Sequence, residues 1–427
     1  MRIVPPISGR TIALLVPRYS YRIAAYQAAA DSLGIHLAII SDGEHSVLPA
    51  VRSGIQVPLD DPMAAVPELV RIGRQAGWDA IFATEDALVE VAARVGLELG
   101  LVANPPDGAR LTSRKDLARA HLERARVPVP TVHVVSLAGD VKAQLDSVSY
   151  PCVAKPVALS GSRGVIRANT ADELDNALAR IRRIVDAAFG ELGSKAVRDT
   201  VLLEQYVPGV EIAIEGMIYD GEFEVIAIFD KPDPLVGPYF EETYYVTPSR
   251  HGAAQLERAV AAVRDAVRAY GLSIGPVHAE VRMDGDDVWI IEVASRTIGG
   301  DCARLLDYQL GRPLEELVLL NLLGERVPLD VSETAAGVMM IPTHEAGTLR
   351  RVEGVIDATR VPFVEDVVIA LRSGYELIPL PEGSTYLGFI FARAPRARQV
   401  EDALRAAYAA LRVVAAPRWE LLPDRSV

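Results

Sequence analysis

Apolar runs alternate with amphipathic stretches along the first hundred residues of the chain. The run Thr11–Val16 predicts a strand, and Ser20–Leu33 predicts a helix that Ser20 caps and Gly34 ends. The same patterns predict two further strands and two further helices, over His36–Ser41, Trp78–Thr84, Val66–Ala76 and Ala87–Gly96. This alternation predicts a parallel sheet covered by helices, an α/β unit over residues 1–105.

The pattern changes to short strands beyond a proline-rich boundary at Asn104–Pro106. Just past it, Ser113 is expected to cap a short helix that carries Lys115, with Asp116 as its capping partner. Strands are predicted over Cys152–Lys155, Gly164–Ala168, Thr200–Tyr206, Glu211–Tyr219 and Glu222–Phe229, and helices over Ala171–Ala188 and Ala253–Tyr270. Residues 106–325 are therefore expected to form an α+β unit with mostly antiparallel strands.

The last hundred residues predict a third, small β-rich unit over 326–427. Its expected elements are strands over Ala336–Pro342, Val367–Leu371 and Tyr386–Ala392 and a helix over Gln399–Leu411. The whole chain thus combines α/β and α+β parts in three domains.

Composition places the chain among ordinary globular proteins, since 50% of its 427 residues are hydrophobic and 24% are charged. A formal net charge of −13 argues against a nucleic-acid partner or an anionic membrane surface. No apolar run approaches the ~20 residues of a membrane helix, and the first run is too short for a signal peptide. With only Cys152 and Cys302, a disulfide framework is excluded. We expect a soluble protein of the reducing cytoplasm.

Lysine is rare, with five residues against 39 arginines, and Lys142 and Lys195 are expected on solvated helices. Lys155 ends a predicted strand, and a loop of small residues follows: Ser160, Gly161, Ser162 and Gly164. Such a loop lets backbone N–H groups approach phosphate oxygens, and the lysine adds a compact charge. An ordinary hairpin explains the loop equally well. The dinucleotide and P-loop fingerprints are both missing from the sequence.

A strand that ends at Glu204 leads into Gln205-Tyr206-Val207, a Pro-Gly turn and Glu211. This segment is a candidate adenine-binding hinge, in which the backbone of Gln205–Val207 meets the base and Glu211 meets the ribose. Surface turns with carboxylates have the same pattern, so the segment by itself leaves both interpretations open.

Two glutamates lie almost symmetrically about a turn at residues 284–287. Glu280 and Glu292 are therefore expected to face each other across a hairpin, within one residue of register. Like charges in this position destabilise a sheet, and a divalent cation such as Mg²⁺ between them removes the penalty. The alternative is a pair of rim carboxylates that face water.

Arg296 follows Glu292 by four residues and can clamp a carboxylate or a transferring phosphoryl group, while Gly299 and Gly300 leave room for substrate. A structural ion pair is the alternative for Arg296. In the long connection 230–249, Lys231, Glu241 or Glu242 is expected to contact the amine substrate or its carboxylate, with an exposed surface loop as the alternative. His278 is expected to point to the opposite sheet face from Glu280, and Cys302 to be a small buried residue.

Taken in order, these features resemble an ATP-grasp enzyme. Within that superfamily the chain resembles the L-amino acid ligases most, because Glu292-Val-Ala294-Ser-Arg296 has alanine where many ATP-grasp enzymes carry a metal-binding asparagine. The C-terminal segments Gly337–Pro342 and Leu380–Phe391 resemble one C-terminal domain type of that group.

The resemblance implies an ATP-grasp fold with an N-terminal Rossmann-like domain, a lid at about residues 130–207 and a small C-terminal domain. It assigns roles to the motif residues: Lys115 and Lys155 for phosphates, Ser160–Gly164 as the mobile part of the lid, Glu204, Gln205, Tyr206 and Val207 for adenine, Glu211 for ribose, Glu280 and Glu292 for Mg²⁺ or Mn²⁺, and Arg296 for the substrate carboxylate and its acyl phosphate.

The implied activity is an ATP-dependent carboxylate–amine ligase that makes an amide through an acyl phosphate, with amino acids as its small-molecule substrates. Alternatives are a biotin-carboxylase-like or purine-pathway ligase, and a nucleotide-binding protein without turnover. Gly300 stands where some dipeptide ligases place a bulky aromatic side chain, so a larger carboxylate substrate is expected and Gly300→Trp should narrow the accepted range. The sequence leaves the oligomeric state open, with a homodimer as one option.

Overall fold

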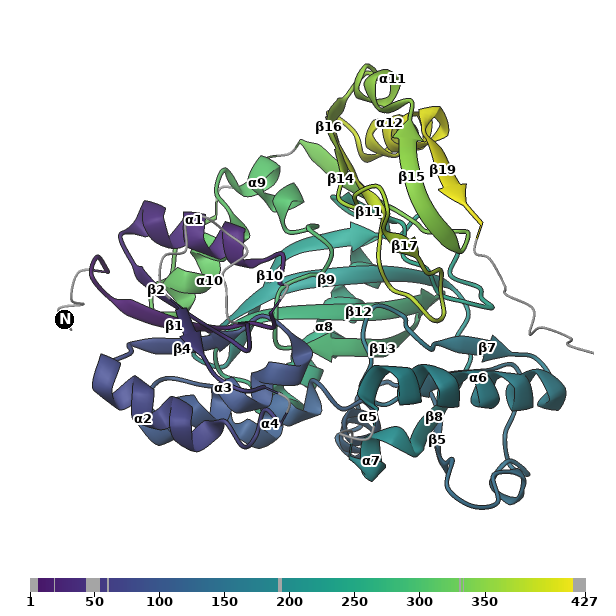
Figure 1. Ribbon diagram of the computed structural model, residues 1–427, viewed down its shortest axis with the longest axis horizontal. Helices are drawn as coiled ribbons and strands as arrows, with labels where there is room; N and C mark the ends of the chain where they lie inside the picture. The colour runs from purple at the N-terminus through teal and green to yellow at the C-terminus, as the bar shows by residue number, and fades with distance from the viewer. Residues whose placement is uncertain are drawn as a thin grey trace, which may run out of the picture.

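The protein was analysed as a computed structural model, which describes residues 7–18, 20–43, 54–59, 61–190, 194–329, 332 and 334–417. Its N-terminal part is a parallel sheet in the order β3-β2-β1-β4 (Figure 1). The strands are β1 (Thr11–Leu15), β2 (His36–Ser41), β3 (Gly54–Gln56) and β4 (Ala80–Ala83). The helices are α1 (Ile23–Leu33), α2 (Val66–Ala76), α3 (Asp86–Leu99) and α4 (Pro106–Leu111).

Alternate residues of β1 enter different cores, as expected for a strand buried on both faces. Ala13 and Leu15 pack with α2 and α3, whereas Ile12 and Leu14 pack with α1 and with the helices that follow the central sheet. Those helices are α9 (Arg304–Leu310) and α10 (Leu314–Leu322). The N-terminal sheet is thereby fixed against the rest of the molecule through an apolar interface.

The central sheet has the order β13-β12-β9-β10-β11-β14-β18-β16 in the described residues, and every neighbouring pair is antiparallel. Its strands are β9 (Val210–Tyr219), β10 (Glu222–Asp230), β11 (Tyr244–Thr247), β12 (Gly275–Asp284), β13 (Asp287–Ala294), β14 (Ala335–Ile341), β16 (Val364–Ile369) and β18 (Gly388–Ala394). Helix α8 (Ala253–Tyr270) covers one end, and α12 (Ala397–Ala410) covers the other. The sheet therefore crosses the expected boundary near residue 325 without a break, and the three domain boundaries stay predictions.

A smaller antiparallel sheet, the lid sheet, has the order β5-β8-β6-β7 and lies at the lower right of Figure 1 with α6 packed on it. Its elements are β5 (Val132–Ser136), β6 (Cys152–Pro156), β7 (Ile166–Ala168), β8 (Thr200–Gln205) and α6 (Ala171–Phe189). Nearby are α5 (Lys115–Arg124), α7 (Lys195–Arg198) and a 3₁₀ helix over Lys142–Gln144.

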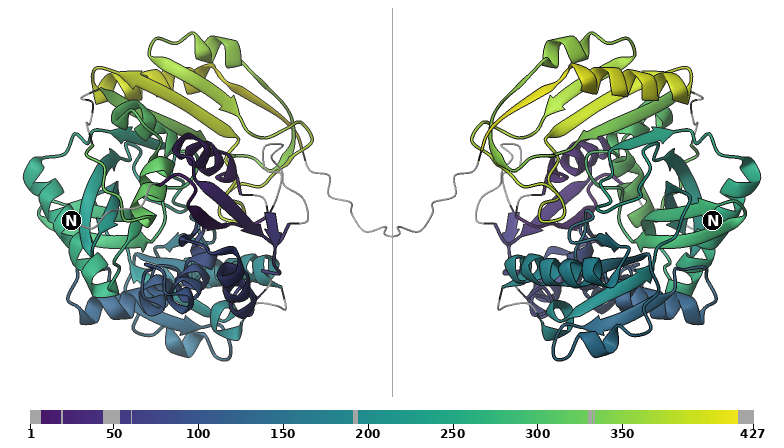
Figure 2. Two further views of the ribbon diagram at one scale, coloured as in Figure 1. Left: turned by 90° about the vertical axis from the view of Figure 1, so that its left-hand side faces the viewer. Right: turned by 90° about the vertical axis from the view of Figure 1, so that its right-hand side faces the viewer.

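The C-terminal part adds a third antiparallel sheet in the order β17-β15-β19, drawn in yellow-green at the top of both views in Figure 2. Its elements are β15 (Gly347–Glu353), α11 (Val355–Thr359), β17 (Glu376–Leu377) and β19 (Arg412–Ala416). Between β17 and β18 the chain returns to the lid sheet, where the Gly164 N–H donates to the Pro381 carbonyl at 2.9 Å. No helix in the described ranges has the length and apolar character that a membrane span requires.

Two predicted helix caps are wrong. Helix α1 begins at Ile23 rather than at the capping position Ser20, and Arg22 is its N-cap residue. Helix α5 has Arg114 as its N-cap, because the Ser113 hydroxyl donates back to the Arg110 carbonyl at 3.1 Å. The long periodic helices are confirmed, with α2 and α8 at the predicted bounds.

Candidate active site

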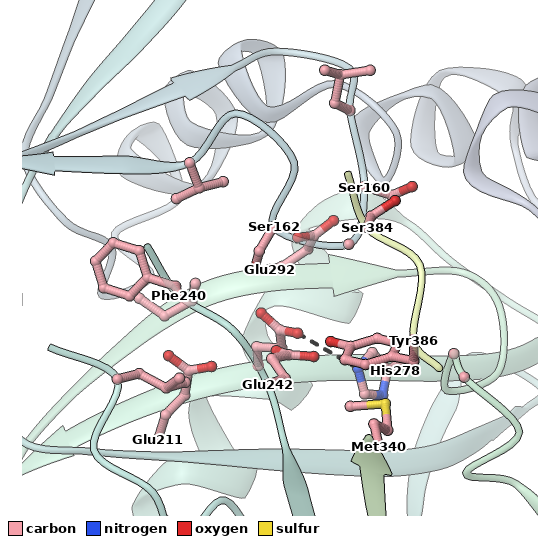
Figure 3. A pocket seen from close by; sticks show the side chains of 18 of the residues that line it. Ser160, Ser162, Glu211, Phe240, Glu242, His278, Glu292, Met340, Ser384 and Tyr386 are labelled. Carbon is pink, nitrogen blue, oxygen red and sulfur yellow. Dashed lines mark ion pairs between the residues drawn. The ribbon is translucent and has the colours of Figure 1, made fainter. Parts of the chain in front are cut away.

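A cavity of about 740 Å³ lies where the lid sheet, the central sheet, the N-terminal sheet and the C-terminal strands meet. Figure 3 shows part of its lining. Most of the predicted site residues line it: Lys115, Lys155, Ser160, Gly161, Ser162, Glu204, Gln205, Tyr206, Val207, Glu211, Glu280, Glu292, Arg296, Gly299 and Gly300. Gly164, Lys231 and Glu241 are not part of this lining.

Glu204 lies at the centre of a buried ion cluster. Lys155 Nζ is 2.6 Å from one carboxylate oxygen, and Arg119 Nε donates to the other at 2.7 Å. Burial would raise the Glu204 pKa, but Arg119 and Lys155 outweigh it and lower the pKa to about 2. Since both oxygens already have cationic partners, we expect adenine to meet the backbone of this hinge rather than the Glu204 carboxylate.

Arg119 was not found from the sequence, although its position on α5 offered a signal. It lies four residues after Lys115 on α5, so the two side chains share one face of that helix. Lys115 Nζ donates to the Leu159 carbonyl at 2.9 Å and lies 3.3 Å from a Glu292 oxygen. Helix α5 thus contributes Lys115 to the cavity lining beside the small-residue loop, whereas Arg119, which is not part of the lining, pairs with Glu204.

That loop turns back on itself through three left-handed positions. Gly161 and Gly164 have φ of +62° and +74°, and Ser162 has φ of +55°. A Cβ at Gly164 would lie 2.7 Å from a ring carbon of Pro156, so this position requires glycine. Gly164 therefore closes the base of the loop, while Ser160–Ser162 face the cavity.

Glu280 and Glu292 are direct partners across the β12–β13 ladder, which confirms the predicted register. Each carboxylate has a separate cation: Lys115 is near Glu292, and Lys231 Nζ is 3.3 Å from Glu280. Burial would raise the Glu280 pKa, but Lys231 and His278 hold it well below its usual value. The charge repulsion that motivated a metal is therefore already reduced, and metal ligation stays a prediction.

A second carboxylate group forms around Lys231. Carboxylate oxygens of Glu211, Glu242 and Glu280 lie within 4.8 Å of one another. Lys231 Nζ is 2.7 Å from Glu211 and also pairs with Glu242. Because Lys231 is buried behind these side chains, the structure gives no support to the predicted contact between Lys231 and substrate.

Glu242 lines the cavity, whereas Glu241 faces His344 at 3.9 Å and lines a separate small pocket. The predicted substrate contact of Glu241 therefore has no support, and Glu242 is the better candidate. Burial and the nearby Glu280 raise the Glu242 pKa to about 7, although Lys231 opposes them. The Tyr245 hydroxyl donates to Glu242 at 2.6 Å.

The predicted orientation of His278 is wrong. Residues two apart on a strand share a face, so His278 lies on the same side as Glu280 and lines the cavity (Figure 3). Its Nδ1 is 3.0 Å from a Glu215 oxygen. Burial would lower the His278 pKa, but the hydrogen bond with Glu215 and the negative charge of Glu280, 3.8 Å from Nε2, raise it to about 9.

Arg296 lines the cavity and also forms a bidentate ion pair. Its Nε and Nη2 donate to the Asp86 carboxylate at 2.8 and 2.9 Å, and Nη1 donates to the Thr297 carbonyl at 3.0 Å. A guanidinium has five N–H groups, and three of those of Arg296 are used in these bonds. One N–H remains on each of Nη1 and Nη2, which is enough to bind one further carboxylate or phosphate. Asp86, at the start of α3, was not found from the sequence.

Gly300 is held by its backbone. Its N–H donates to the Tyr21 hydroxyl at 2.7 Å, and its φ is +63°. A Cβ here would lie 2.8 Å from the Met340 sulfur. Gly300→Trp would therefore strain the backbone as well as fill the cavity, and it is not a clean test of pocket size.

Two family models match the chain. An ATP-grasp domain matches residues 148–304, and L-amino acid ligase C-terminal domain 2 matches residues 339–416. The chain therefore contains an ATP-grasp domain and an L-amino acid ligase C-terminal domain. This confirms the predicted resemblance and the ATP-grasp fold.

Three proteins are similar to this chain over most or more than half of its length. An L-amino acid ligase structure from Bacillus licheniformis superposes with a TM-score of 0.79 at 25% identity, covering 96% of this chain and 100% of that one. Alanine–anticapsin ligase of Bacillus subtilis is 27% identical over 269 residues, which is 60% of this chain and 56% of the ligase. Uncharacterized protein y4rH of Sinorhizobium fredii is 25% identical over 370 residues, 84% of this chain and 72% of that protein.

Proposed function

We propose that this enzyme of the ATP-grasp ligase family joins an amino acid to a second amine, forming an amide through an acyl phosphate and releasing ADP and phosphate. One observation carries the proposal. One cavity, whose far wall is the ligase-type C-terminal domain, is lined by the charged groups that the reaction needs. They are Lys115 and Lys155, the paired carboxylates of Glu280 and Glu292, and the guanidinium of Arg296. Cations for phosphates and a fork for a carboxylate are what carboxyl activation requires.

The residues of the cavity suit a nucleotide and a divalent ion. Lys155, the Ser160–Ser162 loop and the hinge Tyr206–Val207 would hold the phosphates and the base. Glu280 and Glu292 offer the carboxylate oxygens that Mg²⁺ prefers and would hold it as ligands. When bound, the ion supplies neutralisation of phosphate charge.

In the first step, a substrate carboxylate oxygen attacks the γ-phosphorus of ATP, and the bond from phosphorus to the ADP oxygen breaks. The two remaining N–H groups of Arg296 orient that carboxylate. In the second step, the amine nitrogen attacks the acyl carbon, and the bond to phosphate breaks. An ammonium must first lose a proton, and we assign Glu242 to take it because its pKa is about 7 and it lines the cavity.

The test is phosphate release from ATP and Mg²⁺ across pairs of amino acids, with the amide detected by mass. We expect release that needs two partners. Glu292→Gln should abolish it, whereas Glu257→Gln, an exposed carboxylate on α8 outside the cavity, should not. Release that needs bicarbonate or a nucleotide precursor would favour another acyl-phosphate enzyme, an alternative that the ligase-type C-terminal domain disfavours. An unchanged rate in Glu292→Gln would contradict the proposal. A cytoplasmic location and a homodimer stay predictions.

A further inference from the structure

Strand β13 carries one extra residue beside the paired glutamates. In its ladder with β12, Val281 pairs with Ile290. The next residue of β12, Glu280, pairs with Glu292 rather than with Ile291, so one step along β12 corresponds to two steps along β13. Such an insertion is a β-bulge, and bulges occur preferentially next to active sites, where they change the direction of a side chain. Ile291 is the extra residue of this bulge.

The side chains of β13 show what the bulge does. In a regular strand, neighbouring side chains point to opposite faces of the sheet. Here the neighbours Ile291 and Glu292 both line the cavity. Ile290 and Val293, which are three residues apart, both pack in the core with α8. Without the bulge, Glu292 would lie one position out of register and its side chain would point away from that of Glu280. The bulge therefore keeps both carboxylates in the cavity.

A buried guanidinium holds the bulged residue. Arg119 on α5 is 2% exposed, and its Nη2 donates to the Ile291 carbonyl. Its Nε donates to one Glu204 oxygen at 2.7 Å, and the other Glu204 oxygen is 2.6 Å from Lys155 Nζ. A guanidinium presents its donors in a fixed planar fork, so the two acceptors are held in a set position relative to each other. One side chain thus connects the bulge of β13 to the hinge of the lid sheet.

We infer that Arg119 is a positioning residue for carboxyl activation: it fixes the bulge that places Glu292 beside Glu280, and it holds the Lys155 ammonium through Glu204. This role rests on the proposed function, in which the two glutamates hold the ion and the lysine holds phosphates. The ion and the phosphates then take their relative positions from one guanidinium. Arg119 acts only through these neighbours, because it is not part of the cavity lining.

Two substitutions separate the two contacts. Arg119→Lys keeps a positive charge for Glu204, but a single ammonium lacks the fork that also reaches the Ile291 carbonyl. Loss of a contact that supports a metal ligand lowers metal affinity by roughly 10–100-fold. Glu204→Gln is the reciprocal change, because Arg119 keeps the Ile291 carbonyl while Lys155 loses its anionic partner.

The test measures the affinity of the full chain for a non-hydrolysable ATP analogue by calorimetry, once in EDTA and once with saturating Mn²⁺. The ratio of the two affinities reports the contribution of the ion, and the EPR spectrum of bound Mn²⁺ reports its ligands. Arg119→Lys should lower the ratio at least about tenfold and change the spectrum, while the affinity in EDTA changes less than about threefold. Glu204→Gln should lower the affinity in EDTA about tenfold and leave the ratio within about threefold of the wild type. Arg124→Lys, an exposed arginine on α5, is the matched control and should change neither.

A wild-type ratio and a wild-type spectrum in Arg119→Lys would overturn the positioning of the carboxylate pair. Arg119→Gln, which is neutral and shorter, is the second variant if the lysine variant does not fold. It should lower both the affinity in EDTA and the ratio, and an unchanged ratio would overturn the positioning role in the same way.

Amide formation is assayed separately, so the two claims can fail independently. The expected changes in binding without amide formation in the wild type would keep the positioning role and refute the ligase. Amide formation with an unchanged ratio in the Arg119 variants would keep the ligase and overturn the positioning role. No effect of Mn²⁺ on the wild type would overturn both the metal role of Glu280 and Glu292 and the positioning of the pair.

Discussion

The ion pair between Asp86 and Arg296 joins the N-terminal sheet to the reaction centre, and Asp86→Asn tests it. Both side chains are largely buried, with 18% and 12% of their surface exposed. Asparagine keeps one acceptor oxygen but replaces the second with an NH₂ group that cannot accept the Nη2 hydrogen. Arg296 would lose one of its two bonds to this residue and the negative charge that compensates its own.

Breaking a buried pair costs about 3–5 kcal/mol when one charge is left uncompensated. Because asparagine retains one hydrogen bond, we expect the lower end of that range for the free energy of unfolding. A guanidinium displaced by about 1 Å should lower kcat by roughly 100-fold. The KM for ATP should change little, because Asp86 lies outside the cavity lining and the lysines proposed to hold the phosphates, Lys115 and Lys155, come from α5 and the lid sheet.

The assays are steady-state kinetics at saturating ATP and urea unfolding of the same samples. Asp86 is also the first residue of α3, so part of its effect is the helix dipole, worth about 0.3–1 kcal/mol. Asp107→Asn, an exposed acid in the first turn of α4, is the matched control for that part. A wild-type kcat in Asp86→Asn, or a loss of kcat fully accounted for by unfolded protein, would refute the positioning role.

Three further predictions concern groups around the same cavity. Glu204→Gln should raise the KM for ATP about tenfold, because Lys155 loses its anionic partner. The pKa of Glu204 is about 2 in the folded protein against 4.5 when unfolded, so its contribution to stability is complete above pH 4.5 and is lost as the pH falls towards 2. In acid unfolding, the wild type but not the variant should therefore lose this stability between pH 4.5 and 2. Glu382 forms a bidentate, partly exposed ion pair with Arg180 at 2.5 and 2.7 Å, which connects α6 to the C-terminal part. Glu382→Gln should therefore raise the KM for ATP a few-fold and lower the free energy of unfolding by at most about 1 kcal/mol. An unchanged KM would show that this ion pair does not hold the lid sheet in place. Protonated His278 contributes to the free energy of unfolding, fully below pH 6.5 and less as the pH rises through about 9. In His278→Gln, the free energy of unfolding should therefore vary less with pH between 6.5 and 9 than in the wild type. The same pH dependence in both proteins would contradict the raised pKa.

Local patterns predicted the parts of the site that one hairpin or one helix determines. The turn at residues 284–287 sets the register of β12 and β13, so spacing alone places Glu280 within one residue of Glu292; a β-bulge between Glu280 and Val281 brings the two into direct register. His278 could have been placed by the same period of two and was assigned incorrectly. Asp86 is 210 residues from Arg296, and only the packing of the N-terminal sheet on the central part brings them together. No spacing rule connects such a pair.

The difference between the predicted and observed role of Lys231 depends on burial, which the sequence does not show. A lysine in a long connection with acidic neighbours is equally compatible with substrate contact and with an internal counter-ion, and the sequence does not distinguish them. Lys231 is nearly inaccessible and neutralises carboxylates from three separate segments of the chain. The continuation of the central sheet through β14 has a different cause, since strand order depends on pairing between segments far apart in the sequence.

The unbroken central sheet also constrains how this architecture can be recombined. The junction between β11 and β14 is a ladder of paired residues, from Tyr244 with Met339 to Thr247 with Ala336. A chimera that exchanges the C-terminal part with that of a relative must preserve this register, because a slip of one residue would turn the Met340 side chain out of the pocket. Truncation near residue 325 would leave the edge of β11 unpaired and prone to association. The C-terminal strands therefore cannot be exchanged as an independent module, because the residues they contribute to the cavity keep their positions only while the pairing of β11 with β14 is preserved.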